Sequence, residues 1–240
     1  LVWTPKMLSA PGNCVPGSPL PLSQAQIESA FAPTFDPASI SRAFEAMGFR
    51  CGTFSATSGM TCSGRIPPNI EPVALVIPAH FVPSASTDLV LHLHGNNSVG
   101  NTFNRFMGRH DFGGLMTSSG RNAIMVVPYS TGRNVRTNHH ELQSSEGFQL
   151  FMNGVMAKIR NAGLATSSRA GSIGLSAHSG GFYPASRILR SRCTPGETCF
   201  RRKITDVHLF DATYGTTGHE SWPLNAFVDF VRSDSNVTLS

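Results

Sequence analysis

The sequence lacks any apolar run that approaches the roughly 18 residues needed for a membrane-spanning helix, so we expect no membrane span. It is also poor in charge, since only 14% of its 240 residues are Asp, Glu, Lys or Arg, whereas 40% are hydrophobic. This balance excludes intrinsic disorder and is low in charge for a cytosolic protein. Internal repeats are absent, and so are low-complexity tracts beyond a Pro-rich start. We therefore expect a globular chain with one main core.

The basic residues are in excess but are not concentrated. The net charge is +5 and the pI is about 9.2, yet the single tight basic cluster is CFRRK at 199–203. Proteins that bind nucleic acids gather Lys and Arg on one face or along one helix. We therefore interpret the scattered charges as a solvated surface and expect no nucleic-acid partner.

Cysteine is scarce, and its spacing is informative. Each of two pairs flanks a short Gly-, Ser- or Pro-containing loop, which predicts two local disulfides, Cys51–Cys62 and Cys193–Cys199, with Cys14 unpaired. Five reduced thiols are the alternative. Neither pair has the spacing of a zinc knuckle. Because the first residue is Leu1 rather than Met, the disulfides also predict a processed protein that is secreted or periplasmic.

The first 50 residues differ in composition from the rest. A Pro- and Gly-rich start is followed by two expected short helices, one capped at Ser23 and one that starts after Asp36 and stops at Gly48. We interpret residues 1–50 as a Pro-rich arm with a helical appendage. Residues 51–240 are expected to form the main domain.

From about residue 72 onward, apolar runs alternate with amphipathic stretches. Continuous apolar runs are typical of strands buried on both faces, and they occur at 72–78, 88–95, 122–128, 171–176 and 204–211. Helices are predicted over 146–163, 182–191 and 221–233. This order predicts an α/β fold with a mostly parallel central sheet and helices on both faces. The final DSNVTLS has the composition of a strand that is just beginning, so the C-terminal strands of the sheet are expected to be incomplete.

A cluster of small residues joins the fourth predicted strand to the next helix in GSIGLSAHSGGFYPASRIL. A serine presented on a sharp strand-to-helix turn needs small residues two positions to either side. Ser179 meets this requirement with Ala177 and Gly181, whereas Ser176 does not, because His178 follows it. The turn also lies at the carboxyl end of a strand, where sites of α/β sheets gather. We therefore predict that Ser179 is a nucleophile.

This turn resembles the nucleophile elbow of the α/β-hydrolase superfamily, with alanine at the usual first glycine, as in some secreted bacterial serine hydrolases of the esterase, lipase or peptidase type. LHLHGNN (91–97) is similar to the strand and His-Gly turn that supply half of the family's oxyanion hole. The resemblance implies that the backbone N–H of Asn96 or Asn97 joins that of Gly180 at the oxyanion. It also implies that His94 props this turn at the substrate site.

The segment HLFDATYG places a carboxylate directly after a predicted strand. Asp211 follows Ser179 in the chain, as the triad acid does in the superfamily, and the resemblance implies that it orients the catalytic base. A helix N-cap is the alternative role for a strand-end aspartate. The resemblance covers about residues 70–215 and leaves the N-terminal arm unexplained.

The triad histidine is the residue for which the sequence agrees least well with the pattern of the superfamily. A serine hydroxyl needs a base, and His219 follows Asp211 closely enough to loop back toward it. In the superfamily, however, the base follows a last strand well beyond the acid. Three sources of the base therefore stay open: His219, a continuation of the chain or a second polypeptide, and His139 or His140. The last two stand in the polar loop 129–146, which we expect to be solvated or to act as a lid.

A metal site is the competing interpretation. His92 and His94 would present both rings on one face of a strand, but no third ligand stands at the spacing of hydrolytic zinc sites. We therefore expect no metal and no cofactor. The sequence predicts a serine hydrolase that cleaves an ester or amide through an acyl-enzyme on Ser179, with Tyr214 and Phe182 as substrate walls. The alternatives are a noncatalytic binding protein on a hydrolase scaffold and a metallohydrolase.

Overall fold

The computed structural model describes residues 36–52, 59–96, 101–132, 137–193, 199–211, 222–233 and 238–239. All of them belong to one compact unit, Ala32–Ser240. Predictions about Cys14, the arm and the first helix, Asn97, Tyr214 and His219 therefore lie outside the described residues. None of the helices in the described ranges has the length and apolarity needed to cross a membrane.

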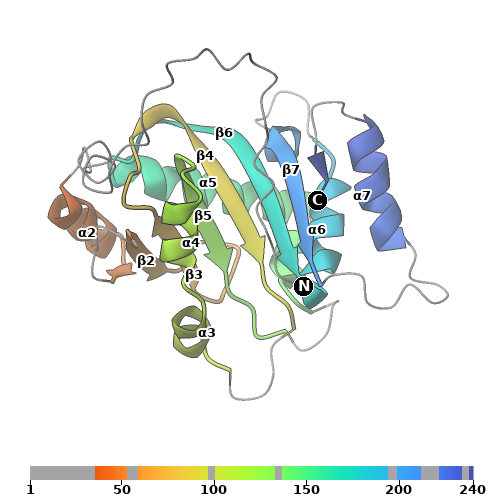
Figure 1. Ribbon diagram of the computed structural model, residues 1–240, viewed down its shortest axis with the longest axis horizontal. Coiled ribbons are helices and arrows are strands. Elements are labelled where there is room, and N and C mark those ends of the chain that lie inside the picture. The colour runs from red at the N-terminus through yellow and green to blue at the C-terminus, as the bar shows by residue number, and fades with distance from the viewer. Residues whose placement is uncertain are drawn as a thin grey trace, which may run out of the picture. The chain divides into compact units, whose positions relative to one another are not determined.

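An eight-stranded sheet runs through this unit in the order β1-β2-β3-β5-β4-β6-β7-β8 (Figure 1). The neighbours β5, β4, β6, β7 and β8 are parallel, whereas β1, β2 and β3 form an antiparallel edge. The predicted fold class, a mostly parallel α/β sheet, is confirmed. The strands are β1 (Arg50–Cys51), β2 (Met60–Gly64), β3 (Val73–Ile77), β4 (Ser84–Leu93), β5 (Ala123–Pro128), β6 (Ala165–His178), β7 (Ile204–Phe210) and β8 (Thr238–Leu239).

Helices cover both faces of the sheet, as predicted (Figure 1). One face shares a large core with α2, α5, α6 and α7, and the other packs against α3 and α4 through Phe106, Phe112 and Met116. Ile40 and Phe44 of α2 lie in the large core, so this helix of the expected appendage packs on the main sheet. The helices are α2 (Pro37–Ala46), α3 (Phe103–Arg109), α4 (Phe112–Ser118), α5 (Ser145–Asn161), α6 (Phe182–Leu189) and α7 (Trp222–Ser233).

The elements that the sequence predicted from residue 72 onward are present. Every residue of β3 and β5 is buried, which explains why their sequences are continuously apolar. Asp36 caps α2 by accepting hydrogen bonds from the backbone N–H groups of Ala38 and Ser39. Three features were not predicted: the β1–β2 edge and the helices α3 and α4, which have seven residues each.

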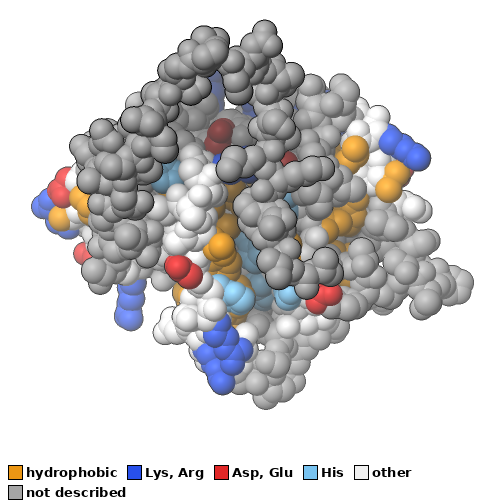
Figure 2. Space-filling model, viewed as in Figure 1, with side chains coloured by type: hydrophobic (Ala, Val, Ile, Leu, Met, Phe, Trp, Pro, Cys, Tyr) orange, Lys and Arg blue, Asp and Glu red, His pale blue; other side chains and the backbone are white. Residues whose placement is uncertain are grey.

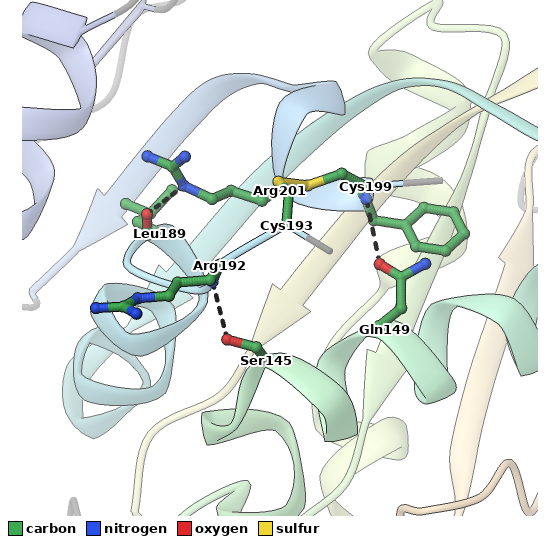
Figure 3. The surroundings of a disulfide bond; sticks show 8 residues. Ser145, Gln149, Leu189, Arg192, Cys193, Cys199 and Arg201 are labelled. Carbon is green, nitrogen blue, oxygen red and sulfur yellow. Dashed lines mark hydrogen bonds between the residues drawn. A yellow bond between two sulfur atoms is a disulfide. The ribbon is translucent and has the colours of Figure 1, made fainter. Parts of the chain in front are cut away.

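Both predicted disulfides are formed. Cys51 and Cys62 lie directly opposite each other and join β1 to β2. Figure 3 shows the other disulfide, Cys193–Cys199, in the connection from α6 to β7. Beside it, the backbone N–H of Arg192 donates to Ser145 Oγ over 2.9 Å. The hydrogen bond ties the start of the α6–β7 connection to the start of α5, and the disulfide joins two residues within that connection.

Candidate active site

The site begins where β6 ends. The strand passes directly into a turn of 3-10 helix, Ser179–Gly181, and then into α6. Ser179 has a φ of 49°, a left-handed conformation that is uncommon for a residue with a side chain. Gly181 has no room for a side chain, because a Cβ there would lie 2.9 Å from the carbonyl oxygen of His94. The predicted sharp turn with small neighbours is therefore present at Ser179.

A second turn, His94–Gly95–Asn96, follows β4 and lies against the first. A Cβ on Gly95 would stand 2.8 Å from the Cβ of Ser179 and 3.2 Å from its Oγ. A Cβ on Gly180 would stand 2.7 Å from Cγ of Asn96. The structure thus brings Ser179, Gly180 and Asn96 together. Because the sequence predicts that this turn supplies half of an oxyanion hole, we call residues 94–96 the oxyanion turn from here on.

Asp211 lies on the neighbouring strand at the same edge of the sheet. His178, the last residue of β6, pairs with Phe210, the last residue of β7, so Ser179 and Asp211 are the next residues of two adjacent strands. Adjacent strands are about 4.8 Å apart. Asp211 is exposed and has a φ of 48°. The structure therefore places this carboxylate beside the elbow.

Backbone strain gathers at this edge. Within the described ranges, the residues other than glycine with positive φ are His139, Ser179 and Asp211. Ser179 and Asp211 directly follow neighbouring strands. His139 contacts the oxyanion turn, since its ring centroid lies 4.6 Å from that of His94. Strained residues cluster at functional sites because the surrounding structure must hold them in place. This distribution marks the carboxyl edge of the sheet as the candidate site.

His94 supports the oxyanion turn from inside the protein. Its Nε2 accepts a hydrogen bond from the backbone N–H of Ser130 over 2.9 Å, so the proton is on Nδ1, which donates to the carbonyl oxygen of Gly95 over 2.6 Å. Burial lowers the pKa of His94 to about 4, and the side chain is only 3% exposed. The prediction that His94 props the turn is supported, but direct contact with substrate is not, because both ring nitrogens bind backbone groups.

Phe182 is a correction to the predicted substrate walls. Its side chain is 9% exposed and belongs to the large core under α6. The other predicted wall, Tyr214, and the candidate base, His219, lie outside the described residues.

The loop expected to be solvated is partly buried. Asn138 and His139 are both 0% exposed, whereas His140 is exposed. Burial lowers the pKa of His139 well below its ordinary range. Ser130, Asn138 and His139 pack behind the oxyanion turn, a placement that sequence reasoning missed because their neighbours are typical loop residues.

Other histidines lie near the carboxyl ends of β4 and β6, beside hydrophobic side chains (Figure 2). His92 hydrogen bonds through Nδ1 to Ser176 Oγ over 2.9 Å, and burial lowers the pKa of its imidazole to about 3. Ser176 is 6% exposed and is a strand residue, as expected. Across the described parts of the chain, no three His, Cys, Asp or Glu side chains are grouped so as to hold a metal ion.

A polar hollow of about 390 Å³ opens beside this site, at the carboxyl end of β5. Its lining includes Glu71, Tyr129, Ser130, Thr131 and Glu141. Since the backbone of Ser130 binds His94, the hollow adjoins the support of the oxyanion turn.

The sequence matches no family model and no curated protein sequence. Esterase 2 of Thermogutta terrifontis, phosphoramylated by tabun, is similar in structure with 11% identity and a TM-score of 0.42, over 69% of this chain and 61% of that chain. This chain thus spans less than two thirds of that esterase.

Two further solved structures are similar. The poly(3-hydroxybutyrate) depolymerase LpqC of Bordetella parapertussis has 13% identity and a TM-score of 0.44, over 85% of this chain and 88% of that chain. An S-formylglutathione hydrolase of Agrobacterium tumefaciens has 13% identity and a TM-score of 0.43, over 79% and 88%. The chain is thus similar to solved structures of an esterase, a depolymerase and a hydrolase, at 11–13% identity and TM-scores of 0.42–0.44.

Proposed function

We propose that the protein is a serine hydrolase that cleaves an ester or amide through an acyl-enzyme on Ser179. The observation that carries this proposal is the convergence of two turns: the strained elbow presents Ser179 against Gly95, and Asn96 packs on Gly180. An exposed carboxylate, Asp211, stands at the end of the adjacent strand. This is the set of groups that acyl transfer requires apart from the base.

The chemistry follows from these positions. Ser179 Oγ attacks the carbonyl carbon of the substrate while the base removes its proton, and the carbonyl oxygen becomes an oxyanion. The backbone N–H groups of Gly180 and Asn96 donate hydrogen bonds to that oxygen. When the tetrahedral intermediate collapses, the base returns the proton to the leaving alcohol or amine. Water then attacks the acyl-enzyme by the same steps and releases the acid.

We assign the base to His219, because it is the histidine that closely follows Asp211 in the chain. Asp211 would accept a hydrogen bond from the imidazole, fix its tautomer and stabilise the imidazolium. A histidine supplied by a continuing chain or a second polypeptide is the alternative. His219→Gln distinguishes the two, since it abolishes turnover only if His219 is the base.

The decisive experiment is covalent labelling. A fluorophosphonate probe is expected to label the full chain at Ser179, with labelling lost in Ser179→Ala and kept in Ser176→Ala. Hydrolysis of p-nitrophenyl butyrate should follow the same pattern and survive EDTA, which separates this proposal from a metallohydrolase. Folded protein that neither labels nor hydrolyses acyl esters would instead support a noncatalytic binding protein.

We also propose that the protein works outside the reducing cytoplasm. The two disulfides support this location, because cytosolic reductants keep most thiols reduced. The proposed partner is an acyl ester or amide, with no cofactor and no nucleic acid.

A further inference from the structure

A buried segment after β5 holds the oxyanion turn from behind. It consists of Ser130, Asn138 and His139, and we call these three residues the buttress. Each is buried, although the surrounding loop is rich in polar residues. Buried polar groups need hydrogen-bond partners, so their contacts show what the buttress restrains.

The first restraint is the side chain of Asn138. Its Nδ2 donates to the carbonyl oxygen of His94 over 2.9 Å, across 44 positions of sequence. The backbone of Asn138 is itself fixed, because its carbonyl oxygen accepts from Gln143 Nε2 over 2.8 Å. One buried amide thus holds the peptide group at the start of the oxyanion turn.

The second restraint is Ser130. Its backbone N–H donates to the ring of His94, and its Oγ accepts from the backbone N–H of His139 over 3.0 Å and of Gly132 over 3.1 Å. Gly132 has no room for a side chain, since a Cβ there would lie 2.6 Å from Cα of Asn138. The two arms of the loop are therefore closed on each other behind His94.

These contacts act on the atoms nearest to Ser179. The buttress holds both the ring and the carbonyl group of His94, and the ring in turn donates to Gly95. Gly95 is the residue whose Cβ position lies 3.2 Å from Ser179 Oγ. The peptide plane after His94 contains the N–H of Gly95, and the bond from Asn138 restrains that plane. The next plane contains the N–H of Asn96, and the bond from the His94 ring to the Gly95 carbonyl oxygen restrains it.

We propose that Asn138 is a positioning residue that aims the oxyanion turn at the carbonyl oxygen of the substrate. The effect of Asn138 on catalysis rests on the proposed function. The hydrogen bond that restrains the turn belongs to the fold and does not depend on that function. Asn138 does not contact substrate in this role. It acts through the carbonyl group of His94.

A substitution at Asn138 can distinguish this positioning role from a contribution to the stability of the fold. Its Oδ1 is buried without a hydrogen-bond partner in the described structure. Asn138→Leu, which is close in size and shape, removes the buried unpaired oxygen but leaves the carbonyl oxygen of His94 without its amide donor. The first change offsets part of the cost of the second, which is about 1–3 kcal/mol, so we expect the variant to fold while the oxyanion turn loses its restraint.

The test compares Asn138→Leu with Asn122→Leu. Asn122 also makes hydrogen bonds from its side chain to backbone, donating to the carbonyl oxygen of Val82 over 2.9 Å and accepting from its N–H over 2.7 Å. It precedes β5, at the opposite end of the sheet from Ser179. The measurements are kcat and KM for p-nitrophenyl butyrate, the rate of fluorophosphonate labelling, thermal unfolding, and hydrogen exchange of a peptide covering residues 91–96.

We expect Asn138→Leu to lower kcat and the labelling rate about 10- to 100-fold, with KM changed less than about twofold, because small misplacements of catalytic groups have effects of this size. Hydrogen exchange at residues 91–96 should accelerate in this variant and not in Asn122→Leu. Folded Asn138→Leu with wild-type kcat and wild-type exchange would overturn the proposal.

If the proposed function is wrong, the result differs from the one that overturns the role of Asn138. The wild-type protein would then neither hydrolyse the ester nor label at Ser179. Hydrogen exchange would still decide whether Asn138 restrains the oxyanion turn, because that readout needs no activity. Unchanged exchange in Asn138→Leu would refute the restraint itself.

Discussion

Ser179 and Asp211 leave neighbouring parallel strands at the same level and in the same backbone conformation, with φ values of 49° and 48°. A left-handed residue that is not glycine costs about 1–3 kcal/mol. In both places the residue that directly follows a strand adopts this conformation. The pair therefore places the proposed nucleophile and a carboxylate at the ends of adjacent strands, on one edge of the sheet.

Asp211→Asn tests the role of the carboxylate. Neutral asparagine cannot stabilise an imidazolium, so we expect kcat to fall about 10³- to 10⁴-fold while the fold is retained. The control is Asp206→Asn on the same strand, which removes a 3.4 Å ion pair with Arg121. Steady-state kinetics on an aryl ester would contradict the assignment if both variants lost activity equally.

Gly181→Ala tests the tight packing of the two turns. The added methyl group would press on the carbonyl oxygen of His94, 2.9 Å away, and on that of Leu93, so either the oxyanion turn or the elbow must shift. We expect labelling at Ser179 to fall by at least about tenfold. Gly108→Ala is the matched control, because nothing lies within 4 Å of its Cβ position and alanine favours helix α3. Labelling of the two variants by one fluorophosphonate probe provides the comparison.

The sequence predicts those site residues whose type is dictated by the local backbone, and not those whose role depends on contacts with distant residues. Ser179 and Gly181 were predictable because backbone strain and close approach dictate small residues within one turn. Asn138 was not, since an asparagine in a polar loop gives no sign that its amide will bind a carbonyl group 44 positions earlier. Its role depends on tertiary contacts alone.

In the fold, too, the elements with a clear local sequence pattern were predictable and the others were not. β3 and β5 were predictable because burial on both faces makes them continuously apolar. β2, with the sequence MTCSG, is small and polar for a strand, and it forms because β3 and the disulfide to β1 hold it. Helices α3 and α4 are too short to display a helical period.

Stability is expected to fall as the pH drops from about 6.5 to about 4. The pKa of His94 is lowered to about 4 in the folded protein, from 6.5 in an exposed chain. Above pH 6.5 neither state is protonated, but between these values the unfolded state takes up a proton that the folded state does not. One pKa unit corresponds to 1.36 kcal/mol, so His94 alone lowers the free energy of unfolding by about 3 kcal/mol at pH 4.

Urea unfolding between pH 7.5 and pH 4.5 measures this effect. His92, whose pKa is lowered to about 3, adds a loss of the same sign. His94→Gln should reduce the dependence of the unfolding free energy on pH, whereas His140→Gln, at an exposed position, should not. An equal pH dependence in all three proteins would contradict the assignment to His94.

The disulfide Cys193–Cys199 is expected to stabilise the α6–β7 connection. Replacing both cysteines by serine should lower the free energy of unfolding by about 2–4 kcal/mol, and chemical denaturation measures that loss.

Alkylation of the denatured, unreduced protein is expected to modify one cysteine of the five, Cys14. Modification of all five would contradict the disulfides.

The hydrogen bond between His92 and Ser176 joins residues 84 positions apart, and it lies between the two strands that lead to the oxyanion turn and the elbow. A nascent chain therefore holds no part of the site until both strands have been synthesised and paired through a long crossover. Such long-range parallel pairing forms slowly. During refolding, recovery of fluorophosphonate labelling at the proposed nucleophile would mark the pairing of β4 with β6 and not the return of helical signal.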